Sequence, residues 1–270
     1  MTTPTTSTTG PQTTATTTAT AANPAQLRER AAALHLNGLL AHWGELDNPA
    51  WVRQLLDWED AERARRSLER RLRSACIGQF KSLTAFDWKW PERCDRAIIE
   101  ELMRLEFLED ATNIILMGPN GVGKTTIAQN LAHQALMHGY KVRFASAGQM
   151  LGELAAIDSA SALTRRLHHY ASFDVLCIDE VGYLSYSNRH ADLLFELTNR
   201  RYERKSTILT TNRAFSEWPE VFPNAACVVS LVDRLTHHAE IVPIVGNSYR
   251  LREAQQRNEQ RAHKRRQKKP

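Results

Sequence analysis

The stretch that decides the fold is Asn113-Ile-Ile-Leu-Met117-Gly118-Pro-Asn-Gly-Val-Gly-Lys-Thr125. Its first five residues form a short apolar run, which is typical of a buried strand, and a helical pattern follows over residues 125–138. Between them, residues 118–125 match the phosphate-binding pattern G-x-x-x-x-G-K-[ST] in the strand-to-helix context that the pattern requires. We therefore predict a strand, a phosphate-binding loop and a helix, in that order.

Each part of this loop has a physical task in binding a triphosphate. Glycines permit backbone angles and close approaches that a Cβ would block, so N–H groups turn inward around the phosphates at the start of the helix. Lys124 is expected to reach the β- and γ-phosphates, and the Thr125 hydroxyl to bind Mg²⁺. The predicted contacts with ATP are Gly118, Pro119, Asn120, Gly121, Val122, Gly123, Lys124, Thr125 and Thr126.

A second apolar run ends in two acids, Asp174-Val-Leu-Cys-Ile-Asp179-Glu180. Downstream of a phosphate-binding loop, this arrangement predicts that Asp179 holds Mg²⁺ and that Glu180 orients the attacking water. The alternative is an ordinary strand that meets solvent at an acidic turn. A water-orienting Glu180 favours hydrolysis of ATP over phosphoryl transfer by a small-molecule kinase.

Three further polar residues are candidates for the same chemistry. Asn212 follows the strand pattern of residues 206–211, and polar groups at such strand ends meet ligands in open α/β sheets; its alternative role is to form the turn. Arg234, on a short predicted helix, is a candidate arginine finger for a neighbouring subunit, and an ion pair within the chain is the alternative. Arg250 is a candidate second phosphate contact.

Strand and helix patterns alternate after residue 110. This alternation predicts an α/β fold, a P-loop NTPase with a parallel sheet and flanking helices, preceded by a small all-helical domain. The predicted strands are residues 113–117, 141–145, 174–179, 206–211 and 240–245. The predicted helices of this region are residues 125–138, 148–170, 190–204 and 230–238.

Composition divides the chain into four parts. Residues 1–24 are rich in Thr, Ala and Pro and are expected to be a disordered tail. Residues 25–109 are expected to form the helical domain, residues 110–252 the ATPase domain and residues 253–270 a basic tail. The aromatic residues of the connector around residues 80–90 are expected to pack helices together rather than to form base-stacking platforms.

The net charge is +5, and arginines are concentrated in a predicted helix over residues 50–76. Cations spaced along one helix can neutralise DNA phosphates without reading bases. The candidate DNA contacts are Arg63, Arg66, Arg70 and Arg73. Because Glu59, Asp60, Glu62 and Glu69 are interleaved with them, the alternative is an exposed helix covered by salt bridges.

Several classes of protein are disfavoured. No run of about 18 apolar residues occurs, so neither a membrane-spanning helix nor a membrane partner is expected. The first residues lack the layout of a secretory signal. The four cysteines are scattered and never form a CxxC pair, which disfavours a zinc site or a disulfide framework. Together these features favour a reducing cytoplasm.

Over about residues 27–253 the sequence resembles the IstB family, ATP-binding helper proteins of insertion-sequence transposition within the AAA+ ATPases. The resemblance rests on the loop, on Asp179-Glu180-Val-Gly-Tyr183, on Arg201-Tyr-Glu-Arg-Lys-Ser-Thr-Ile208 and on Asp233-Arg-Leu-Thr-His-His238. The loop differs from the usual family pattern at Pro119-Asn120 and Thr125-Thr126, but it keeps the phosphate ligands.

The resemblance implies an ATPase domain related to that of DnaC-type helicase loaders, without the usual helical lid. It implies ATP-dependent self-association on duplex DNA and recruitment and stimulation of a cognate transposase. It also implies Lys124, Thr125, Asp179, Glu180 and Asn212 as the ATPase residues, with Arg234 as the finger. The alternative function is a replicative helicase loader, which has the same ATPase domain but a different client.

Overall fold

The computed structural model describes residues 23–46, 50–183, 186–223 and 225–267. The chain divides into two compact units, Met1–Arg66 and Ser67–Pro270, and each is considered by itself. The expected tail over residues 1–24 falls almost entirely outside the described residues. No helix in the described part of the chain is both long enough and apolar enough to cross a lipid bilayer.

The first unit is helical, as the sequence predicts. Asn23 caps its first helix by accepting a hydrogen bond from the Ala25 N–H, and Pro24 occupies the first turn. The unit contains α1 (Pro24–Ala33), α2 (Asn37–Ala41), the 3₁₀ turn η1 (Trp43–Glu45) and the beginning of α3 (Ala50–Ala75). Its small core consists of Leu27, Ala31, Leu34, Val52 and Leu56.

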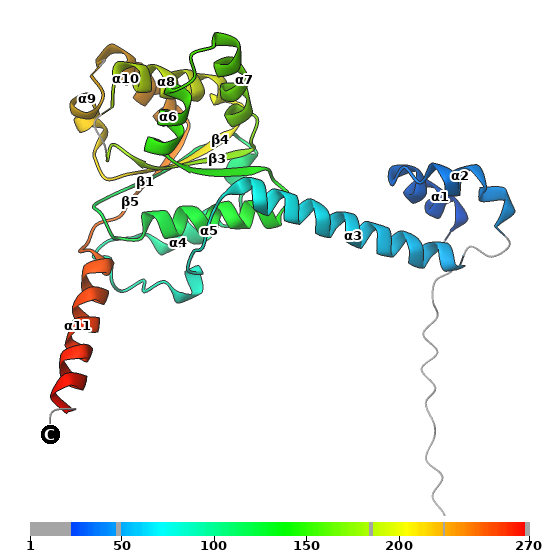
Figure 1. The fold of residues 1–270 in the computed structure, drawn as a ribbon, viewed down its shortest axis with the longest axis horizontal. Coiled ribbons are helices and arrows are strands. Elements are labelled where there is room, and N and C mark those ends of the chain that lie inside the picture. Colours follow the sequence, from blue (N-terminus) through cyan, green and yellow to red (C-terminus); the bar gives the residue numbers. More distant parts are fainter. Residues whose placement is uncertain (1–22, 47–49, 184–185, 224, 268–270) are drawn as a thin grey trace, which may run out of the picture. The chain divides into compact units, whose positions relative to one another are not determined.

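The second unit is built on a five-stranded, all-parallel sheet (Figure 1). The strands are β1 (Asn113–Met117), β2 (Val142–Ser146), β3 (Val175–Val181), β4 (Ser206–Thr211) and β5 (Ala239–Pro243). Their order across the sheet is β2-β3-β4-β1-β5, so β1 lies between the strand that precedes Asn212 and the strand that follows Arg234. The α/β class and all five expected strands are confirmed, with small shifts at the ends.

Helices cover both faces of the sheet, so successive side chains of β1 are buried on opposite faces. Ile114 and Leu116 face α4 and α5, whereas Ile115 faces the layer formed by α6, α7, α8 and α10 (Figure 1). The helices of the unit are α4 (Arg96–Leu102), α5 (Lys124–Met137), α6 (Ala147–Ala155), α7 (Ala160–Ala171), α8 (Asn188–Arg201), α9 (Trp218–Val221), α10 (Ala225–His237) and α11 (Tyr249–Gln267). Its 3₁₀ turns are η2 (Leu83–Ala85), η3 (Glu106–Leu108) and η4 (Phe215–Glu217).

The boundary between the units differs from the one expected near residue 109. Ala75, Ile77, Ile99 and Leu102 are buried in the same core as Ile114 of β1. Residues 67–109 therefore pack as part of the second unit, because their apolar side chains cover α5 and one face of the sheet. Hydrophobic periodicity identified these residues as helical but could not show which core buries them.

Two further elements differ from expectation. The helix expected over residues 148–170 is divided into α6 and α7. Ser159 is the N-cap of α7, and its side chain accepts a hydrogen bond from the Ala162 N–H, so a new helix begins there. The segment expected as a basic tail, residues 253–270, belongs to α11 as far as Gln267, and residues 268–270 lie outside the described part.

Candidate nucleotide-binding site

The loop between β1 and α5 is closely packed by segments distant in sequence. Gly118 needs to be glycine because a Cβ there would lie 1.9 Å from the backbone oxygen of Ile244. Gly123 has a φ of +104° and forms the N-cap of α5, and a Cβ there would lie 2.5 Å from Cε2 of Phe86. The predicted strand–loop–helix is therefore present, and neighbouring segments hold its shape.

Lys124 is buried at the start of α5, with a relative exposure of 8%. Its ammonium group donates hydrogen bonds to the backbone oxygens of Gly118 (2.6 Å) and Pro119 (2.7 Å). Burial lowers the pKa of Lys124 to about 8; nearby Asp179 and Glu180 oppose this shift, and Arg250 adds to it. A cation desolvated in this way gains strongly from a polyanion, which fits a triphosphate bound in the loop.

Thr125 and Asp179, the two residues expected to hold Mg²⁺, lie in contact with each other. The Thr125 hydroxyl lies 3.0 and 3.1 Å from the two carboxylate oxygens of Asp179, and the Thr210 hydroxyl donates to Asp179 at 2.5 Å. Asp179 is only 7% exposed, and within the described residues no basic side chain forms an ion pair with it. A buried carboxylate with hydroxyl neighbours and no direct ion-pair partner has the oxygen chemistry that fits Mg²⁺.

Glu180 has an unusual backbone conformation. Its φ is +61°, in the left-handed region, and the pairing of β3 with β4 shifts register between Ile178 and Val181. The Glu180 N–H donates to the Thr210 hydroxyl at 2.9 Å, which anchors the turn. Left-handed backbone at a non-glycine residue costs about 1 kcal/mol. This local cost coincides with an exposed carboxylate that lines the cavity beside Lys124.

Asn212 lies where the sequence predicts, directly after β4 and in the wall of the same cavity. Its side-chain oxygen is buried and has no hydrogen-bond partner among the described residues. Since a buried polar atom normally has a partner, this oxygen is available to a bound ligand or water. Arg250 also lines the cavity, from the beginning of α11.

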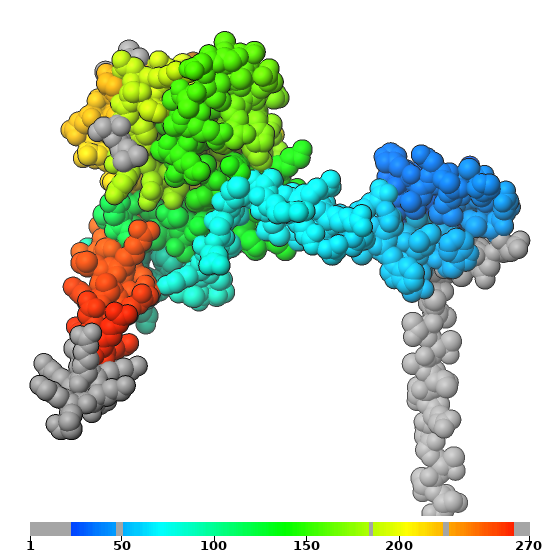
Figure 2. Space-filling model, in the orientation of Figure 1, coloured from blue at the N-terminus to red at the C-terminus, as the bar shows by residue number. Residues whose placement is uncertain are grey.

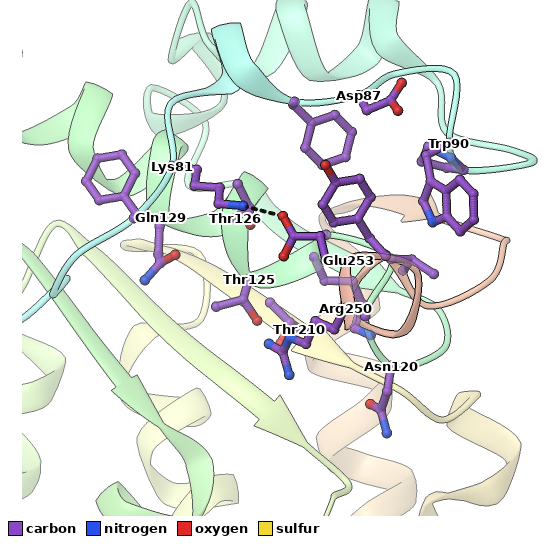
Figure 3. Close-up of a pocket in the computed structure, with 18 of the residues that line it drawn as sticks. Lys81, Asp87, Trp90, Asn120, Thr125, Thr126, Gln129, Thr210, Arg250 and Glu253 are labelled. Atoms are coloured by element: carbon purple, nitrogen blue, oxygen red, sulfur yellow. Dashed lines mark hydrogen bonds and ion pairs between the residues drawn. The ribbon is translucent and has the colours of Figure 1, made fainter. Parts of the chain in front are cut away.

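These side chains surround one cavity of about 540 Å³ (Figure 3). The loop, Lys124, Thr125, Glu180, Asn212 and Arg250 form its polar end. Aromatic side chains from two other segments form the remaining wall, namely Phe80, Phe86, Trp90 and Tyr249. The cavity therefore combines a phosphate-binding end with an apolar region suited to a nucleobase.

The connector aromatics pack against the core, as expected for Phe80, Phe86 and Trp88, and Phe80, Phe86 and Trp90 also line the cavity. Trp90 contacts Tyr249 edge to face, with ring centroids 6.2 Å apart, and its indole N–H donates to the Asn247 oxygen at 2.8 Å. Arg252 stacks over Trp90 at 4.4 Å and forms an ion pair with Asp87 at 3.1 Å. No local sequence pattern identifies this wall, because it forms only when residues 79–91 and α11 meet over the loop.

Arg234 does not line the cavity of its own chain. Its guanidinium group stacks on Phe195 of α8 at 4.7 Å, and its Nη1 atom is buried without a hydrogen-bond partner among the described residues. No ion pair with Asp233 or another acid is present in the described part. Near the end of the same helix, Tyr202 and His237 are hydrogen-bonded at 2.9 Å, which connects the two motifs that carried the sequence resemblance.

The candidate DNA contacts on α3 are of two kinds. Arg63 and Arg66 form ion pairs with Glu59 and Glu62 of the same helix, at 2.5 and 2.6 Å. Hydrogen bonds from Arg65 and Arg66 hold the pKa of Glu62 at about 2. Arg70 and Arg73 are exposed and spaced three residues apart. The salt-bridged alternative therefore describes the first pair, while the second pair presents its charge to solvent.

The chain is similar in sequence to known ATP-binding proteins of insertion sequences. Residues 20–257 match the model of the family described as IstB-like ATP binding protein. The chain is 37% identical over 221 residues to an ATP-binding protein of insertion sequence IS21 from Pseudomonas aeruginosa, covering 81% of this chain and 83% of the relative. It is 33% identical over 229 residues to the corresponding protein of IS5376 from Geobacillus stearothermophilus, covering 82% and 91%.

Among solved structures, the fold is similar to the crystal structure of DnaI. The TM-score is 0.51 at 19% identity, and the match covers 63% of this chain and 93% of DnaI. At this identity the likeness concerns the fold alone. It agrees with the five-stranded parallel sheet and its flanking helices.

Proposed function

The chain belongs to the family of IstB-like ATP-binding proteins, and from this premise we propose that it is an ATP-hydrolysing helper of DNA transposition. The observation that carries the proposal is the convergence of Lys124, Thr125, Glu180 and Asn212 on one cavity, with Asp179 in contact with the Thr125 hydroxyl. Insertion-sequence relatives support the transposition context. The helicase-loader alternative has the support of fold similarity alone.

The proposed hydrolysis follows from the positions of these groups. The N–H groups of the loop, with Lys124 and Arg250, bind and orient the triphosphate. Thr125 and Asp179 would hold Mg²⁺, which supplies positive charge to the β- and γ-phosphate oxygens when bound. Glu180 and Asn212 are placed to hold the attacking water, with Glu180 accepting its proton.

We further propose that the active form is an oligomer in which Arg234 acts on the nucleotide of a neighbouring subunit. Its absence from the cavity of its own chain and its buried, unpartnered Nη1 atom support this assignment. An arginine supplied in this way stabilises charge that develops on the transferred phosphoryl group. Nucleotide state would thereby control assembly.

Duplex DNA and a cognate transposase are the proposed partners. Arg70 and Arg73 support non-specific contact with DNA phosphates because both are exposed on one helix. Transposase recruitment is inferred from the family. We place the protein in the cytoplasm, which is supported by four cysteines that form no disulfide in the structure.

The test is ATP turnover by the full-length chain with Mg²⁺, measured as phosphate release with and without duplex DNA and with and without a candidate transposase. The proposal expects release without any phosphoryl acceptor, stimulated by DNA. Failure to retain labelled ATP would overturn the ATPase assignment. If neither DNA nor the transposase changes the rate of ATP turnover, but a replicative helicase raises it, the loader alternative is favoured.

A further inference from the structure

An ion pair between distant residues lies in the wall of the nucleotide cavity. Nζ of Lys81, in the connector, is 2.9 Å from Oε1 of Glu253 on α11. Both residues line the cavity, and Figure 3 shows the pair as a dashed line near Thr126 of the loop. The mechanism proposed above uses neither residue.

Besides Glu180 and Asp87, Glu253 is a further carboxylate that lines this cavity, and the proposed hydrolysis does not use it. Lys81 lowers the pKa of Glu253 through their hydrogen bond, so the carboxylate stays ionised at neutral pH. The phosphate end already carries the positive charges of Lys124 and Arg250. An anion here would repel phosphates, so it suits a neutral part of the ligand that donates hydrogen bonds.

Only the ribose of a nucleotide has that chemistry in the space between the triphosphate and the base. Glu253 lines the cavity together with Thr126 on the phosphate side and Trp90 and Tyr249 on the aromatic side. The view in Figure 3 draws its carboxylate between Thr126 and Trp90. A carboxylate accepts hydrogen bonds at about four lone-pair positions, so it can hold vicinal hydroxyl groups while it remains paired with Lys81.

We propose that Glu253, held in place by Lys81, accepts hydrogen bonds from the ribose hydroxyl groups and selects ribonucleoside over 2′-deoxyribonucleoside triphosphates. This inference rests on the proposed ATP-binding function. Acidic residues recognise the ribose 2′-hydroxyl in the same chemical way in dinucleotide-binding folds. Arg257, 3.7 Å from the second oxygen of Glu253, is the other cation near the group.

Lys81 has a separate task in this arrangement. It offsets the negative charge of Glu253 in the presence of the phosphates and fixes the carboxylate at the cavity wall. Replacing Lys81 with Met would therefore weaken binding of ATP and of 2′-deoxy-ATP alike. Replacing Glu253 with Gln would change the preference between them. The ratio of the two affinities separates recognition of the ribose from general charge effects.

The experiment is equilibrium binding of ATP and 2′-deoxy-ATP to the full-length chain with Mg²⁺. 2′-Deoxy-ATP lacks the 2′-hydroxyl group and therefore loses its hydrogen bond to the charged carboxylate. The unaltered protein is expected to bind ATP about tenfold more tightly than 2′-deoxy-ATP. Glu253→Gln should reduce this ratio to about two or less, because the neutral amide oxygen is a weaker acceptor. Glu253→Asp, which keeps the charge but shortens the side chain, should give an intermediate ratio.

The matched control is Glu259→Gln, which makes the same charge change on the same helix at an exposed position outside the cavity. It should keep the full preference, and thermal melting reports whether each variant is folded. Equal affinities in the unaltered protein, or an undiminished ratio in Glu253→Gln, would overturn the inference. If the unaltered protein binds neither nucleotide, the proposed function fails instead.

Discussion

The Thr125 hydroxyl lies 3.0 and 3.1 Å from the two carboxylate oxygens of Asp179, although the residues belong to different motifs. The contact places the start of α5 against the end of β3. It shows that the two segments recognised separately in the sequence form one site. Glu180 follows Asp179 in the sequence, and its backbone N–H donates a hydrogen bond to the Thr210 hydroxyl. Its proposed role is to orient the attacking water.

Glu180→Gln is expected to bind ATP but to lower its turnover about a hundredfold or more, because the amide cannot accept the proton of the attacking water. Phosphate release in single-turnover assays measures the effect, and DNA complexes formed with ATP should persist longer. Glu109→Gln, at an exposed position outside the cavity, is the control. Normal turnover by Glu180→Gln would refute the assignment of the water-orienting acid.

Binding of ATP should depend on pH through Lys124. Without nucleotide its pKa is about 8, below the ordinary lysine value, so the folded protein binds fewer protons there than the unfolded chain between pH 8 and about 10. In that window the contribution of Lys124 to folding stability therefore rises with pH. Phosphates favour the charged amine, so ATP binding takes up a proton and its affinity falls as pH rises above 8.

Calorimetry of ATP binding at pH 8.5, in two buffers with different ionisation enthalpies, measures this proton uptake. The same titrations at pH 7, where Lys124 is charged before and after binding, provide the control. An affinity that stays constant between pH 7.5 and 9.5 would contradict the proposed contact between Lys124 and the phosphates.

Arg234 and Lys124 should complement each other in mixed oligomers if Arg234 acts on a neighbouring subunit. Lys124→Ala alone should abolish ATP binding, and Arg234→Ala alone should lower turnover about a thousandfold. Mixing the two variants creates interfaces with an intact Lys124 on one side and an intact Arg234 on the other. Partial recovery of ATPase activity is expected, and none would occur if Arg234 acted only within its own chain.

Arg201 should be important for stability rather than for activity. Its guanidinium group is 2% exposed and donates to the backbone oxygens of Phe173 at 2.7 Å and Ser206 at 2.5 Å. Arg201→Met would leave these oxygens buried and unpaired, at a cost of about 3 kcal/mol. Urea unfolding measures the change. The neighbouring Arg200→Met, which removes only a helix ion pair with Glu196, should cost about 0.5 kcal/mol or less.

Arg70 and Arg73 are predicted to contact DNA phosphates. Replacing both with Ala should weaken DNA binding for all sequences and reduce the slope of log K against log salt by about 0.9 for each lost contact. Fluorescence anisotropy between 50 and 200 mM salt measures both effects. Arg96→Ala, at another exposed arginine, which pairs with Glu100, should leave the slope unchanged; an equal change there would argue against a specific surface on α3.

Local patterns predicted the parts of the site that are continuous in sequence. The run over residues 113–125 identified β1, the loop and the start of α5, because apolar periodicity and loop chemistry agree there. The left-handed backbone of Glu180 was not predictable, since it depends on how β3 pairs with Thr210 of β4. The aromatic wall around Trp90 was also not predictable from the sequence, because the contact of Trp90 with Tyr249 joins segments far apart in the chain.

One missed feature did have a local signal. Ser159 precedes the helix pattern of α7 and is a favourable N-cap, so the break between α6 and α7 was detectable from capping preferences. In contrast, the packing of Ile77 and Ile99 onto β1 could be learned only from the folded chain.

The carbonyl of Ile244 fills the space beside Gly118, and Ser248 and Tyr249 lie beyond it. During synthesis all five strands leave the ribosome before these residues do. A nascent chain can therefore assemble its sheet while the cavity is still open on one side. The cavity is therefore complete only after every strand of the sheet has been synthesised.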